Sequence, residues 1–142
     1  MKTKISSEQQ IEDSKLIIKT VLNLDIHSEM KKKVIDTMIW NITGAKGKYN
    51  LSYISLAARN TPDSKRNHEH VYKKKTMIEK ILIAPSDYEK ILDYAIGCIV
   101  TEEEHRLLNE IDKENPDIDG WERYRLADIK IFDIKENREL NY

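Results

Sequence analysis

The feature that most constrains the fold of this chain is a run of apolar residues at helical spacing in the segment that follows Ser28. Spacings of three and four residues place side chains on one face of a helix. The apolar members of this stripe are Met30, Val34, Ile35, Met38, Ile39 and Ile42. The pattern predicts a core helix over residues 28–43 that ends near Gly44, with this glycine in a left-handed cap.

Helix-start signals recur along the rest of the chain. A hydroxyl residue followed three positions later by Glu or Gln has the pattern of a capping box, in which each side chain bonds the other residue's backbone N–H. The pairs are Ser6 with Gln9 or Ser7 with Gln10, Thr76 with Glu79, Ser86 with Glu89, and Thr101 with Glu104. Short helices are also expected over residues 51–59 and 120–127.

Strand signals are confined to short segments. Residues 98–100 are rich in β-branched side chains, residues 129–134 alternate with a period of two, and residues 67–72 form a short strand or hairpin arm. The last eight residues are expected to be frayed. The sequence therefore predicts an α+β fold that is predominantly helical and contains a small β-hairpin or sheet.

The domain organisation follows from the length of the chain and its lack of linkers. A chain of 142 residues has the usual size of one domain, and its four Gly and three Pro form no linker. We expect a single domain over residues 1–142. It would comprise a helical N-terminal part (1–60), a central region (67–108), and a C-terminal helix and strand (120–134).

Several classes of protein are disfavoured by what the sequence lacks. Cys98 is the one cysteine, so an internal disulfide and a multi-thiolate zinc site are excluded. The first residues have no signal-peptide run, and no stretch has the roughly 20 apolar residues of a membrane span. We therefore expect a cytoplasmic protein with no membrane partner. No Gly-rich phosphate loop or serine-hydrolase elbow is present.

Charge is unevenly distributed along the chain. Residues 46–75 contain eight Lys and Arg against two acidic residues, a balance of +6, whereas residues 102–142 contain thirteen acidic and seven basic residues, a balance of −6. The eight basic residues are Lys46, Lys48, Arg59, Lys65, Arg66, Lys73, Lys74 and Lys75. They predict a nucleic-acid-binding segment; a solvated loop beside an acidic surface is the alternative.

The chemically reactive side chains gather in two segments. The first is His68-Glu69-His70, and the second is the run from Thr101 to His105, which includes three glutamates. Imidazole and carboxylate groups are good ligands for divalent metals, and a free imidazole can accept a proton from water. If residues 68–70 are extended, His68 and His70 share one face of the strand and Glu69 takes the other.

These residues resemble the ββα-metal motif of HNH endonucleases. The resemblance rests on Glu69-His70-Val71, followed by a short apolar strand and a helix that carries Glu-Glu-His105, and it covers residues 67–108. The Gly120-Trp-Glu-Arg-Tyr-Arg run and the Cys98-to-His105 run further resemble small uncharacterised bacterial and phage proteins with an HNH-like pattern.

The resemblance implies a hydrolase that cleaves phosphodiester bonds with a divalent metal such as magnesium, manganese or zinc. It implies that Glu69 and His105 are metal ligands and that His70 is the general base, with His68 as an extra ligand or a phosphate contact. Ile96 stands where the family usually has the Asn that orients the base. The resemblance also implies that Val71 and Ile99 lie on neighbouring strands.

Other interpretations of the same residues stay open at this point. His68 can be a surface residue. His105, which lies on an amphipathic helix, can cap that helix or flank the protein core. Tyr49, Tyr53 and Tyr72 can stack on bases or simply pack against the fold. The competing function is a non-enzymatic phage or mobile-element protein that binds and inhibits a host protein, with the acidic C-terminal third facing a basic partner.

Overall fold

The computed structural model describes residues 4–142 and confirms an α+β fold with one small sheet. Contacts within the chain form two compact units. The helical unit runs up to Lys48 and resumes over Lys74–Ala95, and the sheet unit comprises Tyr49–Lys73 and Ile96–Tyr142. The single domain expected over residues 1–142 stays a prediction. Within the described part of the chain, no helix has the length and apolar character needed to cross a membrane.

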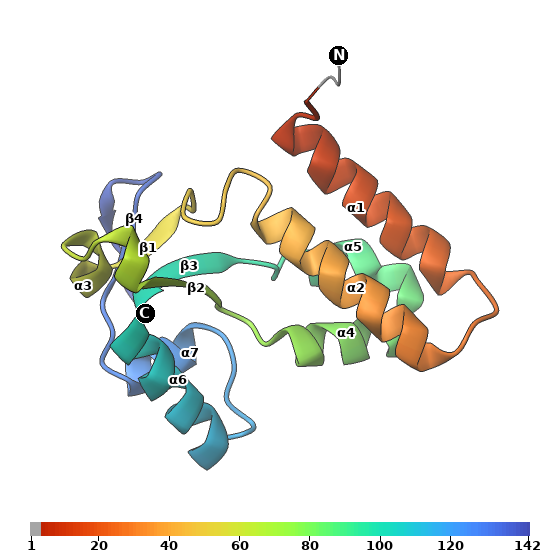
Figure 1. The fold of residues 1–142 in the computed structure, drawn as a ribbon. Coiled ribbons are helices and arrows are strands. Elements are labelled where there is room, and N and C mark those ends of the chain that lie inside the picture. Colours follow the sequence, from red (N-terminus) through yellow and green to blue (C-terminus); the bar gives the residue numbers. More distant parts are fainter. Residues whose placement is uncertain (1–3) are drawn as a thin grey trace. The chain divides into compact units, whose positions relative to one another are not determined.

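The helical unit consists of a helical hairpin followed by two shorter helices (Figure 1). Its elements are α1 (Ser7–Leu22), α2 (Ser28–Thr43), α4 (Lys74–Ile83), a 3₁₀ turn (Pro85–Asp87) and α5 (Tyr88–Leu92). The predicted N-cap of α1 is confirmed, because the Ser6 side chain accepts a hydrogen bond from the backbone N–H of Gln9 at 3.1 Å.

The core of the helical unit is formed by one face of each helix. Its buried members are Ile18, Ile35, Ile39, Met77, Ile78, Ile81 and Leu92. The apolar stripe of α2 is thus confirmed at its centre, whereas Met30, in the first turn, is 52% exposed. The predicted left-handed cap is wrong: Gly44 has φ −94°, and its N–H bonds the Trp40 carbonyl oxygen as in a continuing helix turn.

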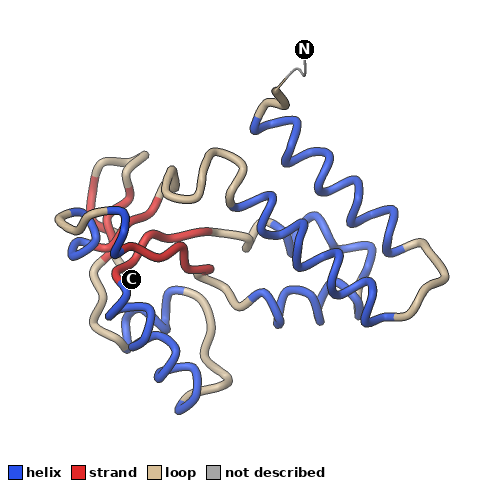
Figure 2. The backbone as a smooth tube through the Cα atoms, viewed as in Figure 1, coloured by secondary structure: helices blue, strands red, loops and turns tan. Residues whose placement is uncertain are grey.

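The sheet unit is built on five strands, which Figure 2 shows in red. Its elements are β1 (Tyr53–Ser55), α3 (Leu56–Arg59), a 3₁₀ turn (Asp63–Lys65), β2 (Arg66–His70), β3 (Gly97–Thr101), α6 (Glu102–Glu114), α7 (Trp121–Leu126), β4 (Ile131–Asp133) and β5 (Arg138–Glu139). The strand order is β2-β3-β1-β4-β5, with β1 parallel to β3 and the other pairs antiparallel.

The antiparallel pair β2–β3 is not joined by a hairpin turn. The chain leaves β2 at His70, forms α4 and α5 in the helical unit, and returns to β3 at Gly97. Just beyond the β2–β3 pairing, where the chain leaves β2, the Val71 N–H donates a hydrogen bond of 2.9 Å to the Ile96 carbonyl oxygen. His68 pairs with Ile99, which confirms that these two segments are neighbours.

The two faces of the sheet have separate apolar cores. One face packs against α6 and α7 through Val71, Cys98, Val100, Leu108 and Tyr124, together with Ile129 and Ile131. The other face packs Ile54 and Ile99 against Ala58 of α3. Because side chains alternate along a strand, each residue of β2 and β3 faces one of these cores.

Several predicted boundaries are wrong, and at β1 and β5 the reason is strand pairing that outweighs the local signal. Residues 53–55, expected in a helix, form β1, since they pair with β3 on one side and β4 on the other. Helix α4 begins at Lys74, two residues before the expected Thr76, and Ser86 makes no capping bond. The terminal segment, expected to be frayed, forms β5 after a turn at Asn137, which has φ 52°.

Candidate functional site

Strand β2 separates the three clustered residues onto two faces. His68 and His70 are both buried, with ring centroids 5.1 Å apart, on the face opposite Glu69. Glu69 pairs with Cys98, which lies in the core beside α6 and α7. The alternation expected from the sequence is therefore present, and Glu69 alone of the three projects toward α6.

The first turn of α6 brings His105 to the same place. Thr101 is the N-cap, and its capping box with Glu104 is confirmed by bonds of 3.1 Å and 2.9 Å in the two directions. The same Glu104 oxygen accepts a 2.5 Å hydrogen bond from the hydroxyl of Ser55, which is fully buried. The start of α6 is thus tied to β1, and this holds His105 in position.

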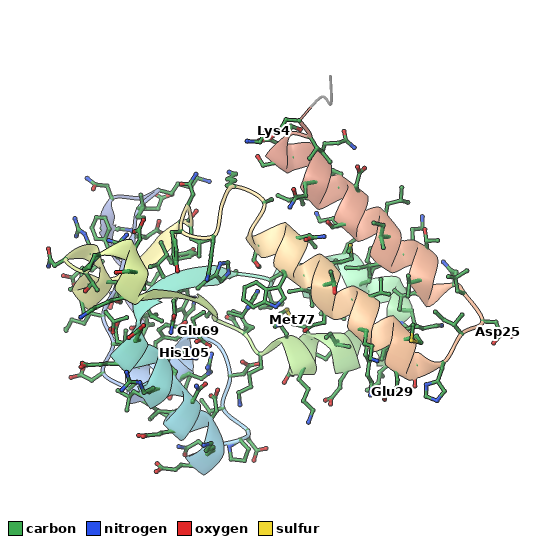
Figure 3. All side chains as sticks on the ribbon, viewed as in Figure 1. Lys4, Asp25, Glu29, Glu69, Met77 and His105 are labelled. Atoms are coloured by element: carbon green, nitrogen blue, oxygen red, sulfur yellow. The ribbon has the colours of Figure 1, made fainter. Side chains whose placement is uncertain are left out.

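Glu69 and His105 meet across 36 residues of sequence. Glu69 Oε2 lies 2.5 Å from His105 Nδ1, and Figure 3 labels the two side chains next to each other. Because a carboxylate only accepts hydrogen bonds, Nδ1 must carry the proton. On the other side of the ring, the amide Nδ2 of Asn109 lies 3.3 Å from Nε2 and donates to it. Both neighbours therefore favour the tautomer in which Nε2 has the lone pair.

The two members of this pair differ in exposure. The Glu69 side chain is 11% exposed, whereas the His105 side chain is 39% exposed. The imidazole therefore reaches solvent, and the carboxylate that orients it lies behind it. A carboxylate behind an imidazole is the arrangement by which histidines are held in one tautomer, either to accept a proton or to bind a metal.

Arg123 of α7 lies behind Glu69 and is 2% exposed. It donates from Nη2 to Glu69 Oε1 at 3.3 Å and binds Asp112 through two bonds of 2.7 Å and 2.9 Å. Its Nη1 donates to the carbonyl oxygens of His70 and Val71, at 3.1 Å and 3.0 Å. Burial alone would lower the pKa of Arg123, but the hydrogen bond and charge of Asp112, aided by the charge of Glu69, raise it.

The two carboxylates around Arg123 have cationic partners. Two carboxylates, Glu69 and Asp112, face two cations, Arg123 and Lys73, whose Nζ lies 3.8 Å from Asp112. Lys73 is held in place by its backbone N–H, which donates to Asp119 at 2.8 Å. Such partners stabilise partly buried carboxylates, since an uncompensated charge away from water is costly.

Two of the three expected metal ligands come together, while the third, His68, and the expected base, His70, lie elsewhere. Glu69 and His105 are in contact, whereas His70 and His68 lie on the opposite face of β2. Across residues 4–142, no group of three or more His, Cys, Asp or Glu side chains could hold a metal ion. One carboxylate oxygen of Glu69 is already bonded to Arg123. The side chains therefore do not fit a metal centre built by the protein alone.

The eight basic residues of segment 46–75 are divided between the units, with Arg59, Lys65, Arg66 and Lys73 in the sheet unit. Several have intramolecular partners. Arg66 bonds Asp63 at 2.7 Å, and Arg59 lies over the ring of Phe132. In the helical unit, Lys74 bonds Asp36 at 2.9 Å and lies over the Trp40 ring, while Lys46, Lys48 and Lys75 complete the set.

The sequence analysis missed three residues of the site: Asn109, Asp112 and Arg123. The i, i+4 spacing from His105 to Asn109 places both on one face of a helix and could have indicated Asn109. The other two give no local signal, because their partners lie in distant segments. No protein-family model, curated protein or solved structure matches the chain.

Proposed function

We propose that this chain is an HNH-like cytoplasmic protein that hydrolyses phosphodiester bonds in nucleic acid, or a relative that binds nucleic acid, and that His105 is its reactive residue. The observation that carries the proposal is the 2.5 Å contact between Glu69 Oε2 and His105 Nδ1, made by the two segments on which the resemblance rests. The proposal keeps the substrate class implied by the resemblance and changes three roles: His105 replaces His70 as the base, and Glu69 orients His105.

In this proposal His105 is the general base. Water first replaces the Asn109 amide at the Nε2 lone pair; Nε2 then takes a proton from this water while the water oxygen bonds to phosphorus and the bond to the leaving oxygen breaks. Glu69 holds the proton on Nδ1 and stabilises the imidazolium that forms. Removal of a positioned general base lowers rates by roughly 10²- to 10⁴-fold. A base must lie within hydrogen-bond reach of its proton, and His70 does not share a centre with Glu69 and His105.

The divalent metal stays a prediction. Since the side chains of residues 4–142 supply no set of three ligands, no step of the proposed reaction passes through a metal. Magnesium often binds to one or two protein groups together with the phosphates of a substrate. Metal dependence is therefore a separate question for experiment, to be asked with nucleic acid present.

The test is a cleavage assay on single- and double-stranded DNA and RNA, with magnesium, with manganese, and with a chelator. The variants are His105→Ala, Glu69→Ala and, as a matched control from the other face of β2, His70→Ala. We expect His105→Ala to lower cleavage by roughly 10²- to 10⁴-fold and His70→Ala to leave it nearly unchanged. The reverse ranking would restore His70 as the base and refute the role given to His105.

A second candidate function is binding to a basic protein partner. It is favoured by the intramolecular contacts of Arg59, Arg66 and Lys74, which leave less of the positive segment for phosphates. The balance of −6 over residues 102–142 suits a basic partner. Salt-sensitive binding to a polylysine peptide, with neither cleavage nor binding of nucleic acid, would replace the enzyme proposal with this one.

A further inference from the structure

Arg123 is the most completely bonded side chain at the site. A guanidinium has five N–H bonds in a planar fork, and here each has an acceptor: two on Asp112, one on Glu69, and the carbonyl oxygens of His70 and Val71. Because Arg123 is 2% exposed and all its donors are used, it is not available to a substrate. Its effect on chemistry must pass through a residue that it holds.

The geometry points to Arg123 as the positioning residue that selects the orientation of Glu69 and, through it, the tautomer of His105. Arg123 takes Glu69 Oε1, which leaves Oε2 directed at His105 Nδ1. The two carbonyl bonds attach the same guanidinium to the end of β2, and the Asp112 bonds attach it to α6. One side chain thus links the strand that carries Glu69 to the helix that carries His105.

This inference rests on the proposed function for its consequence in catalysis, but its structural part can be tested without cleavage. At a pH above about 8 imidazole is neutral, and long-range ¹H–¹⁵N correlation spectra distinguish a ring protonated on Nδ1 from one protonated on Nε2. The chain has four histidines, so the signals of His105 are assigned as those lost in His105→Gln. The wild-type protein is expected to show the Nδ1–H tautomer.

The informative variant is Arg123→Lys, which retains the charge but cannot bond Glu69, Asp112 and the strand carbonyls at once. The His105 signals of this variant are expected to move toward those of Glu69→Ala. If the wild-type protein cleaves nucleic acid, kcat should fall 10- to 100-fold, on the order of the loss for other residues that orient a functional side chain, with KM nearly unchanged. Arg125→Gln is the matched control, since Arg125 lies on α7, is exposed and bonds Glu122.

Folding of each variant is checked by the dispersion of its amide spectrum. If Arg123→Lys does not fold, Asp112→Asn takes its place, because Asp112 is 26% exposed and its loss loosens the same guanidinium. A folded variant at either position with an unchanged His105 tautomer would overturn the inference, as would a wild-type protein without the Nδ1–H tautomer. Absence of both cleavage and binding of nucleic acid by a wild-type protein that shows this tautomer would refute the proposed function and leave the role of Arg123 in setting the tautomer standing.

Discussion

Gly120 precedes α7 with φ 69° and ψ −151°, a backbone conformation that is essentially restricted to glycine. A Cβ atom added there would lie 2.4 Å from Cε1 and 2.9 Å from Cζ of Tyr72. Replacement by alanine therefore adds two costs, which are backbone strain of about 1–3 kcal/mol and overpacking of about 1–3 kcal/mol. We expect Gly120→Ala to lower the free energy of unfolding of the sheet unit by about 2–6 kcal/mol.

The assay can be restricted to the sheet unit, because each unit contains one tryptophan. Trp40 lies in the helical unit and Trp121 in the sheet unit. In a Trp40→Phe background, thermal unfolding followed by Trp121 fluorescence reports on the sheet unit alone. For a unit of this size, under 100 residues, a loss of about 3 kcal/mol lowers Tm by roughly 12–24 °C.

The two contributions at Gly120 can be separated with a second substitution. Tyr72→Leu removes the ring atoms that a Cβ would meet, so adding it to Gly120→Ala should relieve the overpacking and retain the backbone strain. A Tm for Gly120→Ala within about 2–4 °C of the parent protein (about 0.5 kcal/mol) would refute this reasoning.

Three further predictions concern stability and reactivity. Ile39→Asp should destabilise the helical unit by several kcal/mol because it buries a charge, whereas Lys33→Asp on the exposed face of α2 should have little effect on Tm. Thr101→Ala should cost about 1 kcal/mol in chemical denaturation, since it removes the N-cap of α6; an unchanged midpoint would contradict this. The Cys98 thiol should resist thiol reagents until the chain is denatured, because it is buried and burial raises its pKa, so rapid labelling of the folded protein would show an open sheet unit.

The parts of the fold that were predictable are those determined by neighbours in the sequence. The N-cap at Ser6 and the capping box from Thr101 to Glu104 are local interactions over three residues, and both are present. The central stripe of α2 is likewise a local period, and Ile35 and Ile39 are buried as expected. Met30 shows the limit of such a pattern, because a period identifies a helix face and not how far the core extends along it.

The parts that were not predictable depend on partners that are distant in the sequence. Residues 53–55 have no strong strand signal, and they are extended because strands on both sides supply hydrogen bonds. The segment Arg138–Glu139 likewise has no strand signal in the sequence. In the structure it is ordered because it pairs with β4. In neither case does the local sequence contain the information that decides the structure.

At the candidate site, both kinds of determinant meet in one pair of residues. His105 is placed by the local capping box of α6, and Glu69 is placed on the α6 face by the alternation of β2. The resemblance to HNH endonucleases correctly brings the Glu69 and His105 segments together. It also implies that His70 lies at the same site, because a sequence resemblance assigns a role to each residue but does not predict which face of the strand the residue occupies.

The step that the sequence could not supply is the orientation of the Glu69 carboxylate, with one oxygen toward His105. Arg123 bonds the other oxygen, and it does so from α7, 54 residues beyond Glu69. A buried arginine is tolerated only where acceptors surround it, and here they come from β2, from the residue after β2 and from α6. In the sequence Arg123 is one of several charged residues in a polar helix. Its role follows from the convergence of those segments, which is also what gives Glu69 a single orientation toward His105.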